Sequence, residues 1–219
     1  MKRHLPRRVA VAALAMLTTA MLATGLLATG CGGNHAGTNH GDKPAASVPA
    51  SVPASIPADA AFNAADVEFA AAMIPHHQQA VEMALMAETR ATKAEVQQLA
   101  VTIRNAQDPE IATMTAWLRE WNQPVPSPSG DHGTGHGMGH AGMPGMMSEQ
   151  EMKELLASSG TAFDRMFLDM MIRHHQGAID MAEKQQRDGK HPAAKQLAGK
   201  IAQDQAAEIA QMRQLLTTM

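Results

Sequence analysis

The chain has 219 residues, a formal net charge of −3, and a composition that includes 18 Met and 11 His but one Cys and no Tyr. Hydrophobic residues make up 45% of the chain and aromatic residues 3%, so a core must be built from Ala, Leu, Ile, Val and Met, which favours close-packed helices over a β-sandwich. The single cysteine excludes an internal disulfide, a cysteine-based zinc finger and an iron–sulfur cluster. Methionine and histidine are therefore the abundant side chains with affinity for a soft or borderline metal.

The first 30 residues resemble a bacterial lipoprotein signal peptide. Four basic residues within the first eight positions precede an uncharged apolar stretch over residues 9–27, and small residues lead directly to Cys31. Such a segment implies export, cleavage before Cys31 and lipidation of its thiol. The alternative is an uncleaved transmembrane anchor, because about 20 apolar residues can span a bilayer. Both interpretations predict a protein of the cell envelope that is anchored to the membrane and faces its extracytoplasmic side.

The segment after the cysteine predicts a tether. Residues 31–60 are rich in Gly, Ala, Ser and Pro and contain three successive Ser-Val/Ile-Pro-Ala units. Proline at every fourth position disfavours both helix and strand, so we expect an extended chain between the membrane and a domain over residues 61–219. Removal of the signal peptide leaves 14 of the 18 Lys and Arg against 21 acidic residues, and this acidic balance argues against nucleic acid as a partner.

The remainder of the chain contains an internal duplication with a shift of 98 residues. Residues 69–84 read FAAAMIPHHQQAVEMA and residues 167–182 read FLDMMIRHHQGAIDMA, with nine of 16 positions identical. Residues 97–118 align without a gap with residues 195–216, with ten of 22 positions identical. Repeats of this kind indicate that the same supersecondary unit occurs twice.

Each repeat predicts a pair of helices. Apolar residues recur at spacings of three and four over residues 69–83 and 96–117, which is the pattern of one buried helical face. A short turn over residues 89–93 separates the two patterns. The second repeat predicts helices near residues 162–186 and 192–216. Asn63 and Thr161 occupy equivalent repeat positions and are each followed three residues later by an aspartate, so we expect both to cap the first helix of their repeat.

Two such helical hairpins predict an all-α fold. The first hairpin covers about residues 63–121, the second about residues 149–219, and residues 122–148 join them. Antiparallel hairpins bury their apolar faces against each other in a four-helix bundle.

Six polar residues interrupt the apolar faces. Folding each hairpin at its turn should bring His76 opposite Gln107 and Glu110, and His174 opposite the equivalent Gln205 and Glu208. We therefore expect one polar layer across the bundle, flanked by Met73, Met83, Met114, Met171, Met181 and Met212. His77 and His175 lie about 100° further round their helices, so one histidine of each neighbouring pair is expected at the periphery.

The polar layer has two interpretations. In the first, it is a self-contained hydrogen-bond network in which each Glu accepts from its His, Gln107 and Gln205 complete the hydrogen bonds, and the methionines fill the core. In the second, it binds copper, because neutral imidazoles bind copper and thioethers select Cu(I). The predicted metal ligands are then His76, His77, His174, His175, Met73, Met83, Met171 and Met181. Gln107, Glu110, Gln205 and Glu208 would orient the imidazoles from outside the coordination sphere.

The segment between the hairpins also carries candidate ligands. His132, His136, His140 and Met138 lie among closely spaced glycines, which keep the segment out of helix and strand. This composition fits either a flexible linker or a solvent-exposed segment that collects metal ions.

These motifs resemble a known bacterial family. The duplicated MIPHHQQAVEMA and MIRHHQGAIDMA segments, followed by QDPEIATM and QAAEIAQM, resemble the domain of unknown function 305. The resemblance implies a ferritin-like four-helix fold and export from the cytoplasm. Some members are periplasmic copper-binding proteins associated with copper tolerance, which implies a metal-binding role for His76, His77, His174 and His175.

The motif content argues against an enzyme. No Glu in the chain is followed by His three residues later, so the di-iron sites of ferritin-like oxidases are improbable. The domain contains no Cys and no Gly-x-Ser-x-Gly motif, which argues against nucleophilic catalysis. We expect a lipoprotein that binds Cu(I) or Cu(II), for buffering, tolerance or transfer to a protein partner. The alternatives are a bundle that binds another protein or a small ligand through other surfaces, and a metal-dependent redox enzyme.

Overall fold

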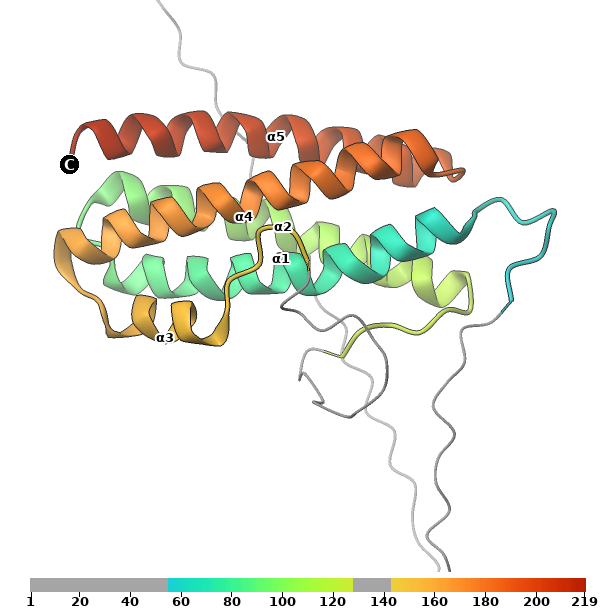
Figure 1. Cartoon of the computed structure of the whole chain (residues 1–219), viewed down its shortest axis with the longest axis horizontal. Helices are drawn as coiled ribbons and strands as arrows, with labels where there is room; N and C mark the ends of the chain where they lie inside the picture. The colour runs from blue at the N-terminus through green and yellow to red at the C-terminus, as the bar shows by residue number, and fades with distance from the viewer. Residues whose placement is uncertain (1–54, 128–142) are drawn as a thin grey trace, which may run out of the picture. The chain divides into compact units, whose positions relative to one another are not determined.

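The computed structural model describes residues 55–127 and 143–219, which form an all-α bundle (Figure 1). Its helices are α1 (Ala64–Arg90), α2 (Ala94–Glu120), α3 (Glu149–Ala157), α4 (Gly160–Asp188) and α5 (Pro192–Thr217). Helices α1 and α2 form one antiparallel hairpin, α4 and α5 form the other, and α1 packs against α4 at the centre of the bundle. The predicted four-helix bundle of two hairpins is confirmed. The short helix α3, which the sequence analysis did not predict, lies in the connection before α4.

Several sequence predictions fall outside the described residues. These are the signal peptide, the lipidated Cys31, most of the tether, and the candidate ligands His132, His136, Met138 and His140. Among the helices that the structure describes, none combines the length and apolar character needed to cross a bilayer.

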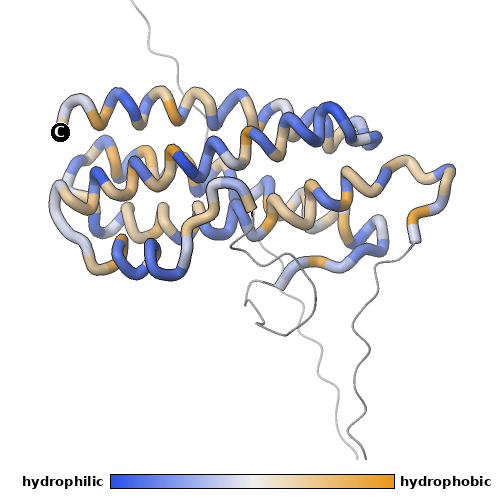
Figure 2. Tube along the Cα trace, in the orientation of Figure 1, coloured by the Kyte–Doolittle hydropathy of each residue, from blue (hydrophilic) through white to orange (hydrophobic). Residues whose placement is uncertain are grey.

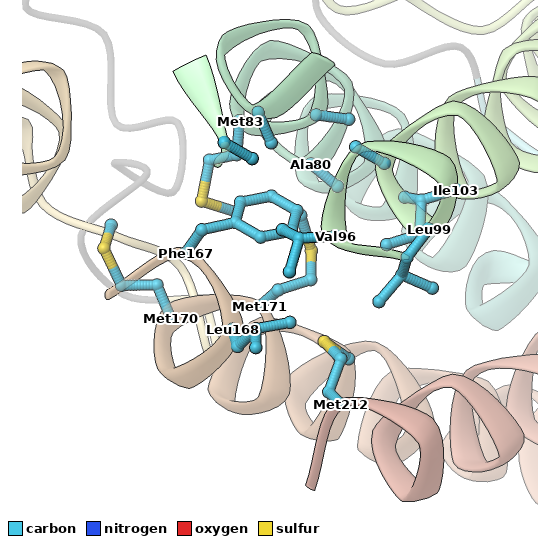
Figure 3. Packing of buried hydrophobic residues seen from close by; sticks show 14 of the residues in the cluster. Ala80, Met83, Val96, Leu99, Ile103, Phe167, Leu168, Met170, Met171 and Met212 are labelled. Carbon is cyan, nitrogen blue, oxygen red and sulfur yellow. The ribbon is translucent and has the colours of Figure 1, made fainter. Parts of the chain in front are cut away.

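A polar layer divides the core into two apolar clusters. Hydrophobic and hydrophilic residues alternate along the long helices (Figure 2), as expected for helices that bury one face. The first cluster joins the C-terminal half of α1 to the N-terminal half of α4 around Phe163 and Phe167 (Figure 3). The second joins the opposite halves around Phe69, Met73 and Ala178. The histidines predicted to form the layer lie between the two clusters in sequence on both central helices.

The two repeats begin their first helices differently. Asn63 caps α1 as predicted, because its side chain accepts from the backbone N–H of Asp66 while the Asp66 carboxylate accepts from the N–H of Asn63. The equivalent prediction for Thr161 is wrong, since α4 begins at Gly160 and Ser159 stands at the cap position without a side-chain hydrogen bond.

An aspartate near the start of each central helix also caps the opposite hairpin. Asp164 on α4 accepts from the backbone N–H groups of Thr92 and Lys93 before α2, at 2.9 and 3.0 Å. Asp66 on α1 accepts from the N–H groups of Lys190 and His191 before α5. Both aspartates are fully buried. Each hairpin therefore supplies the negative charge that stabilises the N-terminus of the other hairpin's second helix.

Candidate metal centre

The four histidines of the repeated motifs form one buried cluster where α1 crosses α4. The imidazole rings of His76 and His174 contact each other across the two hairpins, with centroids 3.8 Å apart and planes tilted by 38°. His77 and His175 are the next residues on each helix, and all four side chains have 0% exposure. The prediction that one histidine of each pair is peripheral is wrong, because the central helices are covered both by each other and by their own hairpin partners. We call these four residues the histidine cluster.

The glutamates pair with the second histidine of each motif. The Nε2 atom of His77 lies 2.9 Å from Oε2 of Glu110, and Nε2 of His175 lies 2.7 Å from Oε2 of Glu208. The sequence predicted His76 and His174 as the partners of these glutamates. That prediction is wrong by one residue, because each glutamate contacts the next histidine along the chain. A step of one residue rotates the side chain by about 100° around a helix, so the first histidine faces the opposite hairpin and the second faces its own.

The pairing leaves several buried polar atoms without a hydrogen-bond partner. The Nδ1 atom of every histidine in the cluster is unpartnered, as is Nε2 of His174. Both amide atoms of Gln107 and Oε1 of Gln205 also lack a partner, although these residues were predicted to complete the network. A closed hydrogen-bond network therefore does not account for the polar layer.

Three imidazoles of the histidine cluster donate a hydrogen bond from the same ring nitrogen, Nε2. His77 and His175 donate from Nε2 to a carboxylate, and His76 donates from Nε2 to the carbonyl of Pro144 at 3.0 Å. A neutral imidazole that donates from Nε2 carries its lone pair on Nδ1. Histidines that bind metals use this arrangement, with one ring N–H held by an oxygen and the other nitrogen free to coordinate.

The cluster favours neutral imidazoles. Burial lowers the pKa of His76 to about 3, and repulsion from His77 adds to the effect. Burial also lowers the pKa of His174 well below its ordinary value, helped by repulsion from the neighbouring histidines. The pKa of His77 is lowered by burial although the hydrogen bond to Glu110 opposes the shift. The imidazoles of His76, His77 and His174 are therefore neutral at pH 7, and each has a lone pair available, as metal binding requires.

The donors suit copper, but they do not form a ready-made coordination sphere. Within residues 55–127 and 143–219, no three side chains of His, Cys, Asp or Glu are arranged to hold a metal ion. Imidazole nitrogens and nearby thioethers are nevertheless the ligand types that copper prefers. Binding at the cluster would therefore require a ring rotation or a contribution from methionine.

The predicted methionine ligands lie on both sides of the histidine cluster. Met83 and Met171 are fully buried and pack around Phe167 in the first apolar cluster (Figure 3). Met73 is fully buried in the second apolar cluster, and the partly exposed Met181 packs against that cluster. These four thioethers belong to the apolar clusters next to the polar layer, as the sequence predicts.

A short segment covers the histidines. Its position was not predicted from the sequence. We call residues 143–148 the strap. Besides the bond from His76 to Pro144, the side-chain amide of Gln79 donates to the carbonyl of Met147 and accepts from its N–H, at 2.8 and 2.7 Å. Gly177 allows the closest approach, because a Cβ atom there would lie 1.9 Å from the carbonyl oxygen of Pro144. Residues 143–148 are therefore fixed to both central helices.

Arg173 holds the far end of the strap. Its guanidinium donates to Glu151 at 2.7 Å and to the sulfur of Met147. The backbone N–H of Ser148 and the Arg173 guanidinium together lower the pKa of Glu151 to about 2. The sequence did contain a signal for the strap: Arg173 and Gly177 stand where the first repeat has Pro75 and Gln79, so the repeated motifs differ in chemistry at the positions that hold it.

The fold and the buried histidine layer define an all-α bundle with a candidate metal centre. Comparison of the chain with known protein families identifies the family to which it belongs. Residues 66–216 match the family described as Domain of unknown function (DUF305), and the chain belongs to this family. None of the curated proteins matches the chain significantly.

Solved structures show the same fold. A putative secreted DUF305 protein from Streptomyces coelicolor is 36% identical, with a TM-score of 0.62 over 70% of this chain and 93% of that chain. CopM in its Cu(II)-bound form is 36% identical, with a TM-score of 0.58 over 70% of this chain and 96% of that chain. CopM in its Cu(I)-bound form is 32% identical, with a TM-score of 0.57 over the same shares. CopM has also been solved in silver-bound forms.

Proposed function

We propose that this protein binds copper at the histidine cluster, as a lipid-anchored protein of the cell envelope that buffers copper or passes it to a partner protein. The observation that carries the proposal is the set of four unpartnered Nδ1 atoms in one buried cluster. Three of these imidazoles have their other ring nitrogen held by an oxygen. This is the orientation that a metal-binding histidine needs before the metal arrives.

A purely structural role for the layer is the competing interpretation. The hydrogen bonds from His77 to Glu110 and from His175 to Glu208 fit both roles, since they could stabilise the core or orient metal ligands. The unpartnered Nδ1 atoms and the Gln107 amide distinguish the two. A buried polar atom without a partner costs about 1–3 kcal/mol, and a layer selected for stability alone would have replaced or paired such groups.

The relatives support copper as the ion. CopM, which shares the fold and about a third of the aligned residues, binds Cu(I), Cu(II) and silver. The thioethers next to the histidine cluster suit the soft ions in this set. The sequence after residue 31 contains no Cys, a composition suited to an oxidising compartment outside the cytoplasm. The anchor at Cys31 and the envelope location rest on the signal-like N-terminus.

The geometry supports binding in preference to catalysis. All four histidines have 0% exposure, and a catalytic metal needs an open coordination position that a substrate can reach. A buffer or carrier needs only that the ion enter and leave.

The test is an anaerobic Cu(I) titration of the mature chain against a competing chelator. The first variant replaces all four histidines of the histidine cluster by Gln, and a second, Glu110→Gln/Glu208→Gln, removes the carboxylates. A matched control replaces the three loop histidines, His132, His136 and His140, by Ser. We expect the first variant to lose tight binding, the second to bind about 10–100-fold more weakly, and the control to retain the bundle site.

Two results would contradict the proposal. One is binding by the wild-type chain that is no tighter than binding by a scrambled His/Met peptide. The other is complete loss of metal from the loop control, which would place the copper in the loop and leave a structural role for the layer. Circular dichroism of each variant shows whether the bundle is still folded.

A further inference from the structure

The histidine cluster is closed to solvent, so an ion that binds there needs an outer position at which to lose its first waters. On the side that faces the strap, the carbonyl of Pro144 accepts the hydrogen bond from His76 and stands between that imidazole and the surface. Gln79 holds the next part of the strap through two hydrogen bonds to Met147. Any uptake position on this side must therefore lie next to the strap.

The structure has a cleft at this place. It has a volume of about 350 Å³ and lies between α1, the strap and α4. Pro144 lines the cleft, so a single residue borders both the cleft and the histidine cluster. Two thioethers from different elements also line it, Met143 on the strap and Met181 on α4. Both side chains are partly exposed, in contrast to the fully buried Met73, Met83 and Met171.

The walls of the cleft combine apolar side chains with polar and charged ones, Glu68, Asp180, Lys184, Gln185 and Arg187. Gln185 lines the cleft and is 1% exposed, and its Oε1 atom has no hydrogen-bond partner while its Nε2 donates to Asp66. At the edge of the cleft, Lys184 pairs with Glu68 at 3.1 Å and Arg187 pairs with Glu183 at 3.9 Å, so each cation of the rim has an acidic partner.

We propose that this cleft is the uptake site for Cu(I), with the sulfurs of Met143 and Met181 as its first protein ligands. The inference rests on copper binding at the histidine cluster. Thioethers bind Cu(I) and discriminate against the harder divalent ions. The ion then exchanges the thioether ligands for Nδ1 atoms of the histidine cluster when the strap shifts, and the bond from Nε2 of His76 to Pro144 that orients this imidazole forms again once the ion is bound. The transfer keeps copper as Cu(I) and releases no proton, because the receiving Nδ1 already carries a lone pair.

The experiment uses the mature chain labelled with ¹³C at the methionine methyl groups. Silver(I), which substitutes for Cu(I) and is not readily oxidised to a paramagnetic divalent ion, is added in steps while the methyl resonances are followed by NMR, and the rate of Cu(I) uptake from a chelator is measured by stopped flow. The test variant is Met143→Leu/Met181→Leu, which keeps side-chain volume but removes both sulfurs. The control is Met152→Leu, because Met152 is also partly exposed but does not line the cleft.

We expect the Met143 and Met181 resonances to shift at the lowest silver concentrations. Cu(I) uptake should be about tenfold slower in the double variant, because an ion that reaches the cleft finds no thioether to bind, while the histidine cluster still fills at equilibrium. The control should match the wild type. Wild-type uptake rates in the double variant, or a filled cluster without any shift at Met143 and Met181, would overturn the uptake site and leave the proposed function intact. Failure of the wild-type chain to bind Cu(I) or silver would overturn both.

Discussion

The two repeats provide the same histidine–glutamate pair in two different settings. In the first repeat, the carboxylate of Glu110 contacts His77 and also lies 3.5 Å from Nζ of Lys200. In the second, Glu208 contacts His175, and the position equivalent to Lys200 is occupied by Thr102. The difference shows that the duplication preserved the groups that orient the imidazoles and allowed the outer contacts to change.

The repeats differ most where the strap binds. The first repeat contributes Gln79, which holds Met147 through two hydrogen bonds. The second contributes Gly177, which admits the carbonyl of Pro144. A symmetric pair of hairpins would offer the strap two equivalent positions, so these substitutions restrict it to one side of the histidine cluster. The symmetric features therefore build the bundle and the cluster, and the asymmetric features decide from which side the strap covers it.

Acid should produce the largest effect, because it acts on the histidines of both repeats together. Burial lowers the pKa of His76, His77 and His174 in the folded chain, while in the unfolded chain these residues titrate near pH 6.5. Below that pH these histidines bind protons in the unfolded chain, whereas they remain neutral in the folded chain. The free energy of unfolding should therefore fall as the pH drops from 6.5 towards 3, by up to about 1.4 kcal/mol per pH unit for each histidine.

Urea unfolding at pH 7, 6 and 5 measures this loss, since most carboxylates stay ionised in that range. The His76→Phe/His174→Phe variant serves as the comparison and should show a flatter pH profile. An unfolding free energy that does not change between pH 7 and pH 5 would contradict the prediction.

The reciprocal helix caps should stabilise both repeats, and Asp66 should contribute somewhat more because it also accepts from Asn63 and Gln185. Asp66→Ala leaves the N–H groups of Lys190 and His191 without their acceptor, and Asp164→Ala does the same to Thr92 and Lys93. We expect each variant to lose about 3 kcal/mol in the free energy of unfolding, because buried donors to a charged group become unpaired.

Denaturant unfolding compares these two variants with Asp169→Ala, a change at an exposed position on α4. The control should change stability by less than about 0.5 kcal/mol. A large loss in one repeat and none in the other would show that the hairpins do not cap each other symmetrically.

The asymmetric position of the strap should depend on Gly177. In Gly177→Ala the new Cβ would lie 1.9 Å from the Pro144 carbonyl oxygen, so the strap must move. We expect a destabilisation of about 1–3 kcal/mol and faster hydrogen exchange at the Met147 amide. The matched control is Gly199→Ala on α5, where the nearest atom would be 3.6 Å away and the substitution should stabilise the helix by up to about 1 kcal/mol. Equal behaviour of the two variants would contradict the role of Gly177.

The smallest effect should come from Lys200. This cation contacts Glu110, and Thr102 occupies the equivalent position in the first repeat. The side chain of Lys200 is 57% exposed and contacts Glu110 and Asp204. Lys200→Met should therefore change the free energy of unfolding by less than about 0.5 kcal/mol, since exposed ion pairs are screened by water and salt. Thermal unfolding at low and high salt tests this, and a loss above about 1 kcal/mol would mean that Lys200 is part of the cluster's support.

Part of the site could be predicted because the relevant signal is local. The spacing of His76, His174 and the two glutamates on apolar helical faces was enough to predict a polar layer in the core. It was not enough to decide which histidine meets which glutamate, because neighbouring residues differ by about 100° around a helix. That choice depends on how α1 rotates against α2 and α4, which is set by the packing of all four helices.

The sequence by itself determined the four long helices, their duplication and the presence of buried histidines, because helical periodicity and a repeat of 98 residues are visible along the chain. Only the tertiary structure decided that His76 meets His174 across the hairpins and that Asp66 and Asp164 each cap the opposite hairpin. It also decided that the strap lies on the histidine cluster. These contacts join residues far apart in the chain, so they follow from the packing of one hairpin on the other and leave no periodic pattern in the sequence.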